Sequence, residues 1–383
     1  MAAGMANGKK RILRGCSLKG RTRKMILVIV SIILCAALVL GGVMLYGKYQ
    51  MSRIPELTFK EALEYTTKDN PDAVITVGII KDGELSYKVY GENGREISAE
   101  IHTYEIGSLT KTFTAALINK AGMEGKLDLD STIDNYLSLP EGKEYPTVEE
   151  LLTHTSGYKG YYFESQMISN FFKGRNDFYG ITKEMVLGRV KDLDMKKENY
   201  DFVYSNFGYA VLGLVLEEVY ESDYTTIVSD FVRNDLGLKD TGISDKSGDL
   251  GDYWDWKEND VYLSAGAITS NISDMLSYAQ MQLDGNPYCA ECHESIKTIN
   301  ASTQDYKMMG INMDGIGMSW IIDEENGIIW HNGGTGEYNS YLGFHPETET
   351  AVVILSNLSP NYRIPATVLG IKLLTEMDDQ SGL

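Results

Sequence analysis

The sequence predicts an α+β fold, in which helices flank one antiparallel sheet and a mainly helical lobe is inserted at about residues 130–270. Apolar β-type segments occur near both ends of the chain, and helical patterns dominate the stretch between them. Strands from both ends complete one sheet only if the helical stretch between them is an insertion. A long uncharged run near the N-terminus adds one transmembrane helix.

The N-terminal region has the pattern of a signal anchor. Residues 25–45 carry no charge, and about 20 apolar residues suffice to span a bilayer as a helix. Eight Lys or Arg and no acidic residue precede this run, which places the N-terminus in the cytoplasm. We therefore predict a basic cytoplasmic tail over 1–24, a signal anchor over 25–47 and a linker over 48–56.

Two alternatives exist for this segment. A cleaved signal peptide usually has an apolar core of only ~7–15 residues, which is shorter than the run found here. A lipoprotein cleavage site needs a small residue before its cysteine, whereas Leu34 precedes Cys35.

The N-terminal part of the remaining chain contains helix and hairpin signals. Thr58-Phe59-Lys60-Glu61 has the form of a capping box that opens a helix. The segments 74–80 and 86–90 alternate around a Lys81-Asp82-Gly83 turn, which predicts a β-hairpin. A second capping box is predicted at Thr147 to Glu150.

The C-terminal part is predicted to return to the sheet. Three strands are expected around 315–323, 327–331 and 338–345, and a fourth over 350–355. A helix at about 364–376 closes the domain, which we expect to span 57–378. That length is ample for two lobes around one core.

Ser108-Leu109-Thr110-Lys111 places a serine one helical turn before a lysine at the start of a helix-forming run. Residues three apart share a helix face, so the amine can lie beside the hydroxyl. The N–H groups of the first turn favour a developing alkoxide, which makes Ser108 a candidate nucleophile. A lysine acts as a base only if burial and neighbouring positive charge lower its pKa.

The same spacing also occurs in Ser156-Gly157-Tyr158-Lys159. Gly157 interrupts a helix directly after Ser156, so Lys159 is not expected to be held one turn away.

Two further groups of residues accompany Ser108 and Lys111. Tyr204-Ser205-Asn206 lies where an extended stretch enters an apolar helix, and His331-Asn332-Gly333-Gly334 lies between two expected strands. Taken singly, the first is compatible with a capping asparagine beside a packed tyrosine, and the second with an ordinary hairpin.

In this order, the three groups resemble the motifs S-x-x-K, Y-x-N and H-x-G of the serine β-lactamase and penicillin-binding protein superfamily, in its class C-like branch. Leu151 to Gly157, Ser264 to Ser270 and Gly343 to Glu347 add to the resemblance, which covers about residues 57–378. It implies a β-lactamase/DD-peptidase-like fold with the active site between the two lobes.

The resemblance implies a role for each matching residue. Ser108 would form an acyl-enzyme, with Lys111 and Tyr204 moving the proton, and which of the two is the base stays open. Asn206 would bind the substrate amide or the lysine. The N–H groups of Ser108 and Gly334 would form the oxyanion hole, with Gly333 beside them.

His331 takes the place of a lysine that would bind a substrate carboxylate. A neutral imidazole attracts a carboxylate less than an ammonium does. The resemblance therefore implies a peptidase acting on D-amino-acid peptides, or an esterase, outside the membrane. The alternatives are a true β-lactamase and a penicillin-binding sensor or scaffold without turnover.

Composition restricts the partners and cofactors. The chain has 54 acidic against 35 basic residues, and the tail takes eight of the basic ones, so nucleic-acid binding is not expected. The expected partners are a small peptide, ester or β-lactam substrate and the membrane. No metal or nucleotide motif is present, and no cofactor is expected. Cys289-Ala290-Glu291-Cys292-His293 matches a haem attachment motif, but a local disulfide is the favoured interpretation.

Overall fold

A computed structural model describes residues 25–36, 38–42, 47 and 52–381 of the chain. The chain divides into two units, Met1–Glu56 and Leu57–Leu383. Among the described residues of the first unit, the helix Met25–Gly42 has a mean hydropathy of 2.9 and the length to cross a membrane. A signal sequence would have the same length and composition. The expected basic tail over 1–24 and residues 43–46 of the expected anchor lie outside the described residues.

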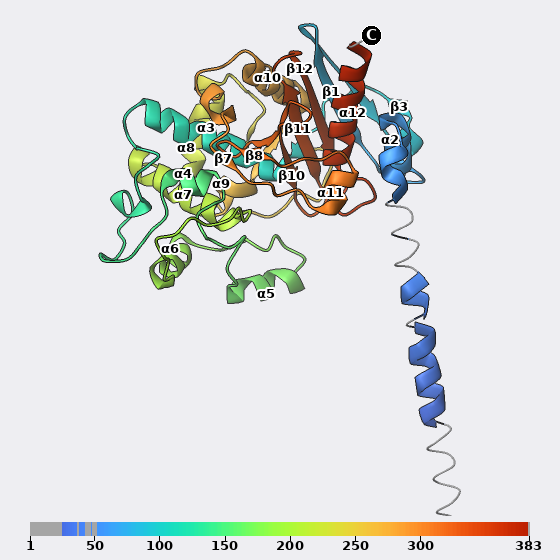
Figure 1. The fold of residues 1–383 in the computed structure, drawn as a ribbon, viewed down its shortest axis with the longest axis horizontal. Helices are drawn as coiled ribbons and strands as arrows, with labels where there is room; N and C mark the ends of the chain where they lie inside the picture. Colours follow the sequence, from blue (N-terminus) through green and yellow to red (C-terminus); the bar gives the residue numbers. More distant parts are fainter. Residues whose placement is uncertain (1–24, 37, 43–46, 48–51, 382–383) are drawn as a thin grey trace, which may run out of the picture. The chain divides into compact units, whose positions relative to one another are not determined.

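The larger unit is built on a nine-stranded antiparallel sheet with the order β3-β2-β1-β12-β11-β10-β9-β8-β7 (Figure 1). Its strands are β1 Ile75–Lys81, β2 Glu84–Tyr90, β3 Glu96–Ile97, β7 Lys297–Thr298, β8 Gly315–Ile316, β9 Ile321–Asp323, β10 Ile328–Gly334, β11 Asn339–His345 and β12 Thr350–Ser356. Strand β1 pairs with β12, with Ile75 opposite Ser356. The prediction that both ends of the chain complete one sheet is therefore confirmed.

Helices account for most of the remaining structure. The α-helices of this unit are α2 Phe59–Thr67, α3 Thr110–Met123, α4 Val148–Leu152, α5 Ser165–Phe172, α6 Lys183–Asp192, α7 Asn206–Tyr220, α8 Tyr224–Asp230, α9 Leu263–Gly266, α10 Ile272–Leu283, α11 Gln304–Met308 and α12 Ala366–Ser381. Shorter turns are η1 Ile54–Glu56 in the first unit, and η2 Glu92–Gly94, η3 Gly107–Leu109, η4 Ile133–Asn135, η5 Phe231–Asp235 and η6 Ala290–His293 in the larger one. A small second sheet has the order β4-β6-β5, formed by Tyr104–Glu105, Ile268–Ser270 and Gly242–Ile243. Helices α4 to α9 fall within the predicted lobe of 130–270.

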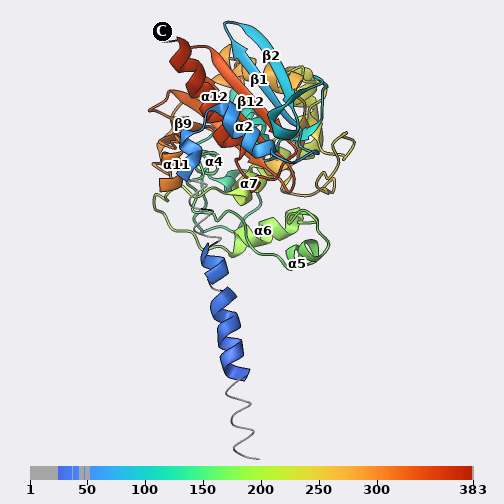
Figure 2. The same cartoon turned by 90° about the vertical axis from the view of Figure 1, so that its right-hand side faces the viewer.

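Two helices cover opposite faces of the large sheet. A Cβ atom on Gly78 of β1 would meet Ile272 and Leu276, so this face packs against α10. On the other face, Tyr341 of β11 packs against Gly370 of α12. Figure 2 shows α12 and α2 together in front of the strands. The central strands are therefore buried on both sides, and β12 is buried along its whole length.

Several local predictions are confirmed. Both capping boxes are present: Thr58 and Thr147 each accept a bond from the N–H three residues later, while Glu61 and Glu150 bond back to them. The hairpin also forms, with Lys81 still paired to Glu84, so that only Asp82 and Gly83 make the turn.

Two strand predictions need correction. The strand expected at 315–323 is two short strands, β8 and β9, separated at residues 317–320, where Ser319 has a φ of +75°. The strand expected to end at 331 continues to Gly334, because His331 to Gly334 pair with β11 rather than forming a loop.

The favoured disulfide between Cys289 and Cys292 is wrong, because both are buried free thiols. The Cys292 sulfur lies 3.9 Å from the Met318 sulfur and 3.6 Å from the Tyr288 carbonyl oxygen, so it is directed away from a bridge. Burial raises the pKa of Cys289 to about 11 and that of Cys292 well above its ordinary value, which keeps both protonated.

Candidate active site

The backbone around Ser108 is packed tightly against the end of β10. Gly107 has a φ of +51°, and a Cβ atom at this position would lie 2.5 Å from the Gly334 nitrogen. The Ser340 hydroxyl donates a hydrogen bond of 2.7 Å to the Ile106 carbonyl. These contacts hold η3, and Ser108 within it, beside Gly334.

Lys111 is completely buried and reaches back to Ser108. Its Nζ lies 3.0 Å from the Ser108 Oγ and donates a hydrogen bond of 2.6 Å to the Ala265 carbonyl. Burial lowers the pKa of the Lys111 amine well below its ordinary value. The pKa of Lys111 is therefore lowered, as expected. Burial is the cause, whereas the sequence analysis also required a neighbouring positive charge.

Tyr204 completes this cluster. The Lys111 Nζ lies 5.0 Å from the centre of its ring. Burial raises the pKa of the phenol well above its ordinary value, and the Ser108 hydroxyl lowers it by less. The phenol is therefore protonated at neutral pH.

His154 holds the Tyr204 segment in place, a role that the sequence did not reveal. Its Nδ1 accepts a hydrogen bond of 3.1 Å from the Ser205 N–H, and its carbonyl accepts one of 2.9 Å from Val203. Its ring lies 4.5 Å from that of Tyr204, measured between centres. Burial, Lys111 and His331 lower its pKa well below the ordinary value, so the imidazole is neutral. In the sequence, the only indication of this role is that His154 lies within Leu151 to Gly157, one of the segments that carry the family resemblance.

His331 is buried in β10, with its ring centre 6.3 Å from that of Tyr204. Burial and Lys111 lower its pKa to about 3, so the imidazole is neutral at physiological pH. The Asn332 carbonyl can only accept a hydrogen bond, so the contact of 2.6 Å to it assigns the proton to Nδ1. The Nε2 atom is then only an acceptor.

The glycines after His331 have different environments. A Cβ atom on Gly333 would lie 1.9 Å from the Ile106 carbonyl, so this glycine serves close packing behind the nucleophile. Gly334 is exposed. On one side, β10 pairs with β11 as far as Gly334. On its other side, β9 pairs only with Ile328 to Trp330. Among the described residues, this second side of β10 therefore has no strand partner from His331 to Gly334.

Asn206 is less engaged than the other candidates. It is the first residue of α7, whose N-terminus is capped by the Ser205 hydroxyl. The described residues supply its side chain with no hydrogen bond, so the structure does not join it to Lys111.

The second S-x-x-K segment forms no comparable arrangement. The Ser156 hydroxyl is buried and accepts a bond from the Tyr158 N–H. Lys159 is exposed, and its Nζ lies 6.0 Å from the Tyr162 ring centre.

Glu105 links the nucleophile segment to the loop beyond Gly334. Its carboxyl accepts hydrogen bonds of 2.5 Å from the Thr335 hydroxyl and 2.7 Å from the Trp254 N–H. Burial raises its pKa to about 7, although these bonds and Lys246 act in the opposite direction. The Glu105 carboxyl therefore joins the segment before Ser108 to the loop after Gly334.

Two hollows are lined by residues close in sequence to members of the cluster. One of about 390 Å³ is lined by Trp254, Gly336 and Glu337, just beyond Gly334. The other, of about 470 Å³, is lined by Thr155, Phe202 and Lys297, just before Tyr204 in the chain. Ser108, Lys111, Tyr204 and His331 line neither hollow.

A serine beside a buried lysine and a tyrosine, at the edge of an antiparallel sheet with helices on both faces, defines the class of serine hydrolases with the β-lactamase fold. The beta-lactamase family model matches residues 68–370, and the chain belongs to this family.

Comparisons with individual proteins agree with this assignment. Protein flp of Staphylococcus aureus strain MW2 is 24% identical over 314 residues, which are 74% of this chain and 59% of flp. The chain thus spans about three fifths of this relative's length. The octameric penicillin-binding protein homologue from Pyrococcus abyssi is 23% identical with a TM-score of 0.65, covering 83% of this chain and 75% of that one. A beta-lactamase/D-alanine carboxypeptidase from Yersinia pestis is 18% identical with a TM-score of 0.65, covering 86% and 99%.

Proposed function

We propose that the chain is a membrane-anchored serine acyl hydrolase that forms an acyl-enzyme on Ser108. The observation that carries this proposal is the position of the buried Lys111 amine 3.0 Å from the Ser108 Oγ. An amine whose pKa is lowered by burial is neutral for part of the time near pH 7, and only the neutral form takes a proton.

The pKa directions favour Lys111 over Tyr204 as the first base. Neutral Lys111 removes the Ser108 hydroxyl proton as Oγ bonds to the substrate carbonyl carbon, and the carbonyl electron pair moves to its oxygen. The N–H groups of Ser108 and Gly334 then stabilise this oxyanion, a contribution of ~2.7–4 kcal/mol per donor.

Tyr204 completes the proton transfer in this scheme. Its protonated phenol donates to the leaving nitrogen or oxygen as the bond to the carbonyl carbon breaks, and the Lys111 ammonium then returns a proton to the phenolate. In the second step, neutral Lys111 removes a proton from water as the water oxygen bonds to the ester carbon on Ser108. The bond from this carbon to Ser108 Oγ then breaks, Oγ regains a proton, and the acid is released.

The substrate we propose is a D-amino-acid peptide or an ester. Neutral His331 carries its one proton on Nδ1 toward Asn332, so it has no donor left for a substrate carboxylate. The free edge of β10 at Gly334 suits an extended substrate backbone.

We also propose that the helix Met25–Gly42 is an uncleaved anchor, with the N-terminus in the cytoplasm and the larger unit outside. The support is its length and hydropathy together with the eight preceding basic residues. Full-length protein in the membrane fraction, accessible to external protease, is the expected result. A soluble form beginning near residue 47 would show a cleaved signal peptide.

A burst assay with an activated ester tests the catalytic proposal. The expected result is continuous turnover by wild type and none by Ser108→Ala. One stoichiometric burst would indicate a penicillin-binding sensor, and silence would indicate a scaffold. A penicillin turned over faster than any ester or D-amino-acid amide would identify a β-lactamase.

A further inference from the structure

The short helix α5 has an unusual orientation on the larger unit. Its polar residue Asn170 is buried, and the Asn170 side-chain amide donates hydrogen bonds to the carbonyls of Asp177 and Tyr179. Of its four apolar residues, Met167 is buried, whereas Ile168, Phe171 and Phe172, spaced i, i+3 and i+4, face outward. A helix of a soluble domain normally has the opposite arrangement.

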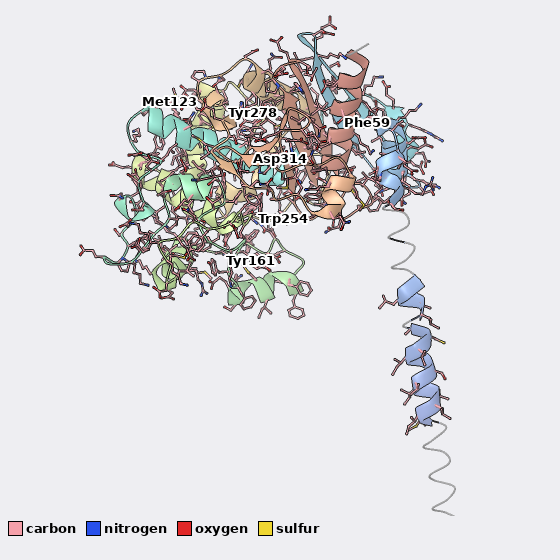
Figure 3. The ribbon with its side chains drawn as sticks, in the orientation of Figure 1. Phe59, Met123, Tyr161, Trp254, Tyr278 and Asp314 are labelled. Atoms are coloured by element: carbon pink, nitrogen blue, oxygen red, sulfur yellow. The ribbon has the colours of Figure 1, made fainter. Side chains whose placement is uncertain are left out.

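The exposed fractions are large. Phe171 is 74% and Phe172 81% exposed, and Ile168 is 50% exposed. Phe163 and Tyr161, just before the helix, are 61% and 56% exposed. We call these five residues the aromatic face. Figures 1 and 2 both show α5 at the edge of the larger unit, and in Figure 3 side chains project from it away from the core.

The neighbouring aromatic residues do not cover this face. Tyr158 is buried against Phe207, and Tyr162 packs on the same ring, with its centre 4.7 Å away. The loop is therefore anchored through these two rings. Tyr161 lies edge-on to Phe178, with ring centres 6.4 Å apart, yet it stays 56% exposed. An exposed apolar group of this size usually marks a contact surface.

The charges around the aromatic face suit an anionic lipid surface. Residues 158–177 include three Lys or Arg against Glu164 and Asp177, within a chain that carries 54 acidic against 35 basic residues. Glu164 is paired with Arg189 at 3.0 Å, and Arg175 with Asp255 at 3.4 Å. Lys173, directly after α5, forms no ion pair with any described residue. Aromatic residues beside basic ones are typical of helices that lie in the lipid interface.

The chain length before the larger unit points to the same occupant. Fourteen residues separate Gly42 from Leu57. They reach at most about 50 Å when fully extended. If Met25–Gly42 spans the bilayer, as the proposed function holds, the larger unit always remains close to that bilayer.

We propose that the aromatic face docks into the interface of a phospholipid bilayer. Phe171 and Phe172 enter the region between headgroups and acyl chains, and Lys173 contacts the anionic headgroups. The inference rests on the proposed function in one respect: the anchor keeps the larger unit near a membrane. The docking contact itself is a separate property of α5.

The test is an environment-sensitive fluorophore on Phe171→Cys in the full chain, with Cys16 and Cys35 replaced by serine so that no accessible native thiol competes. The protein is reconstituted in vesicles of phosphatidylcholine and phosphatidylglycerol with spin-labelled acyl chains. Met123→Cys is the matched control, because Met123 is 54% exposed and lies on a distant part of the unit in Figure 3.

The expected result is a blue-shifted emission at position 171 that the spin-labelled lipid quenches at least threefold more than at position 123. Replacing Phe172 by serine in the same protein should reduce this quenching. Equal and weak quenching at both positions would overturn the proposal. A blue shift at 171 without lipid quenching would also overturn it, since a second copy of the chain would then cover the face.

Anchoring is read separately in the same preparation. Retention in the vesicles after alkaline carbonate reports on Met25–Gly42 and not on α5. If the protein is released, it is added to fresh vesicles from outside: quenching at 171 then still supports docking, and its absence overturns it.

Discussion

Lys111 and Ala265 are 154 residues apart in the chain, yet the Lys111 Nζ donates a hydrogen bond of 2.6 Å to the Ala265 carbonyl. This bond uses one proton of the amine and helps direct the rest of the group toward Ser108. A neutral amine that donates here still has its lone pair free for the Ser108 proton. The backbone of α9 thus orients the amine that we propose as the base, which the sequence locates only by spacing.

Activity should depend on the deprotonation of Lys111. We expect kcat/KM to rise with pH along an acidic limb that ends well below pH 10, because burial lowers the pKa of this amine. Lys111→Arg should lower kcat/KM by ~10²–10⁴-fold, since arginine stays protonated. The matched control is Lys159→Arg, which changes the exposed lysine of the second S-x-x-K segment. An unchanged acidic limb in Lys111→Arg would exclude Lys111 as the base.

His331→Lys tests substrate selection. A lysine would add a donor, and in its protonated form a charge, at a position where the imidazole donor is already used by Asn332. We expect kcat/KM for esters with a carboxylate to increase relative to kcat/KM for esters without one. The expected increase corresponds to ~1–2 kcal/mol. Paired esters with and without a carboxylate measure this ratio. His331→Gln, which adds no charge, is the control, and an equal shift in both variants would contradict the argument.

Glu105→Gln tests the link between the nucleophile segment and Thr335. The folded pKa of Glu105 is about 7, above its ordinary value of 4.5, because burial disfavours the carboxylate. The protonated Glu105 carboxyl therefore contributes fully to the free energy of unfolding below pH 4.5. This contribution is lost as pH rises through 7, because the carboxyl then ionises. The upper limit of this loss is about 3 kcal/mol.

Denaturant unfolding between pH 4.5 and 8 measures the effect. Wild type should lose free energy of unfolding over this range, whereas Glu105→Gln should show a flatter profile. Glu100→Gln, at an exposed position, should follow wild type. Identical slopes in all three proteins would show that Glu105 does not ionise in this range.

Sequence patterns located the parts of this molecule that depend on near neighbours. The capping boxes at Thr58 and Thr147 and the hairpin around Asp82 and Gly83 are such parts, because their residues contact each other within a few positions. The spacing of Ser108 and Lys111 likewise predicted a contact that one helical turn enforces.

The remaining site features arise from contacts between distant segments. No local pattern predicts the contacts of Ala265 or Glu105, whose partners are 154 and 230 residues away. The same limit applied to Cys289 and Cys292, where spacing favoured a bridge but burial beside Met318 keeps the thiols separate. The proton position on His331 depends on a contact with the adjacent Asn332 carbonyl, which residue types alone do not reveal.

The most direct test of the account is the residue that a serine-reactive fluorophosphonate modifies in the full chain, identified by peptide mass spectrometry. We expect one adduct, on Ser108. This adduct should be absent in Ser108→Ala, and its formation should be strongly slowed in Lys111→Arg. The buried hydroxyl of Ser156 should remain unmodified. An adduct on Ser156, or labelling of Ser108→Ala at the wild-type rate, would contradict the assignment of Ser108 as the nucleophile.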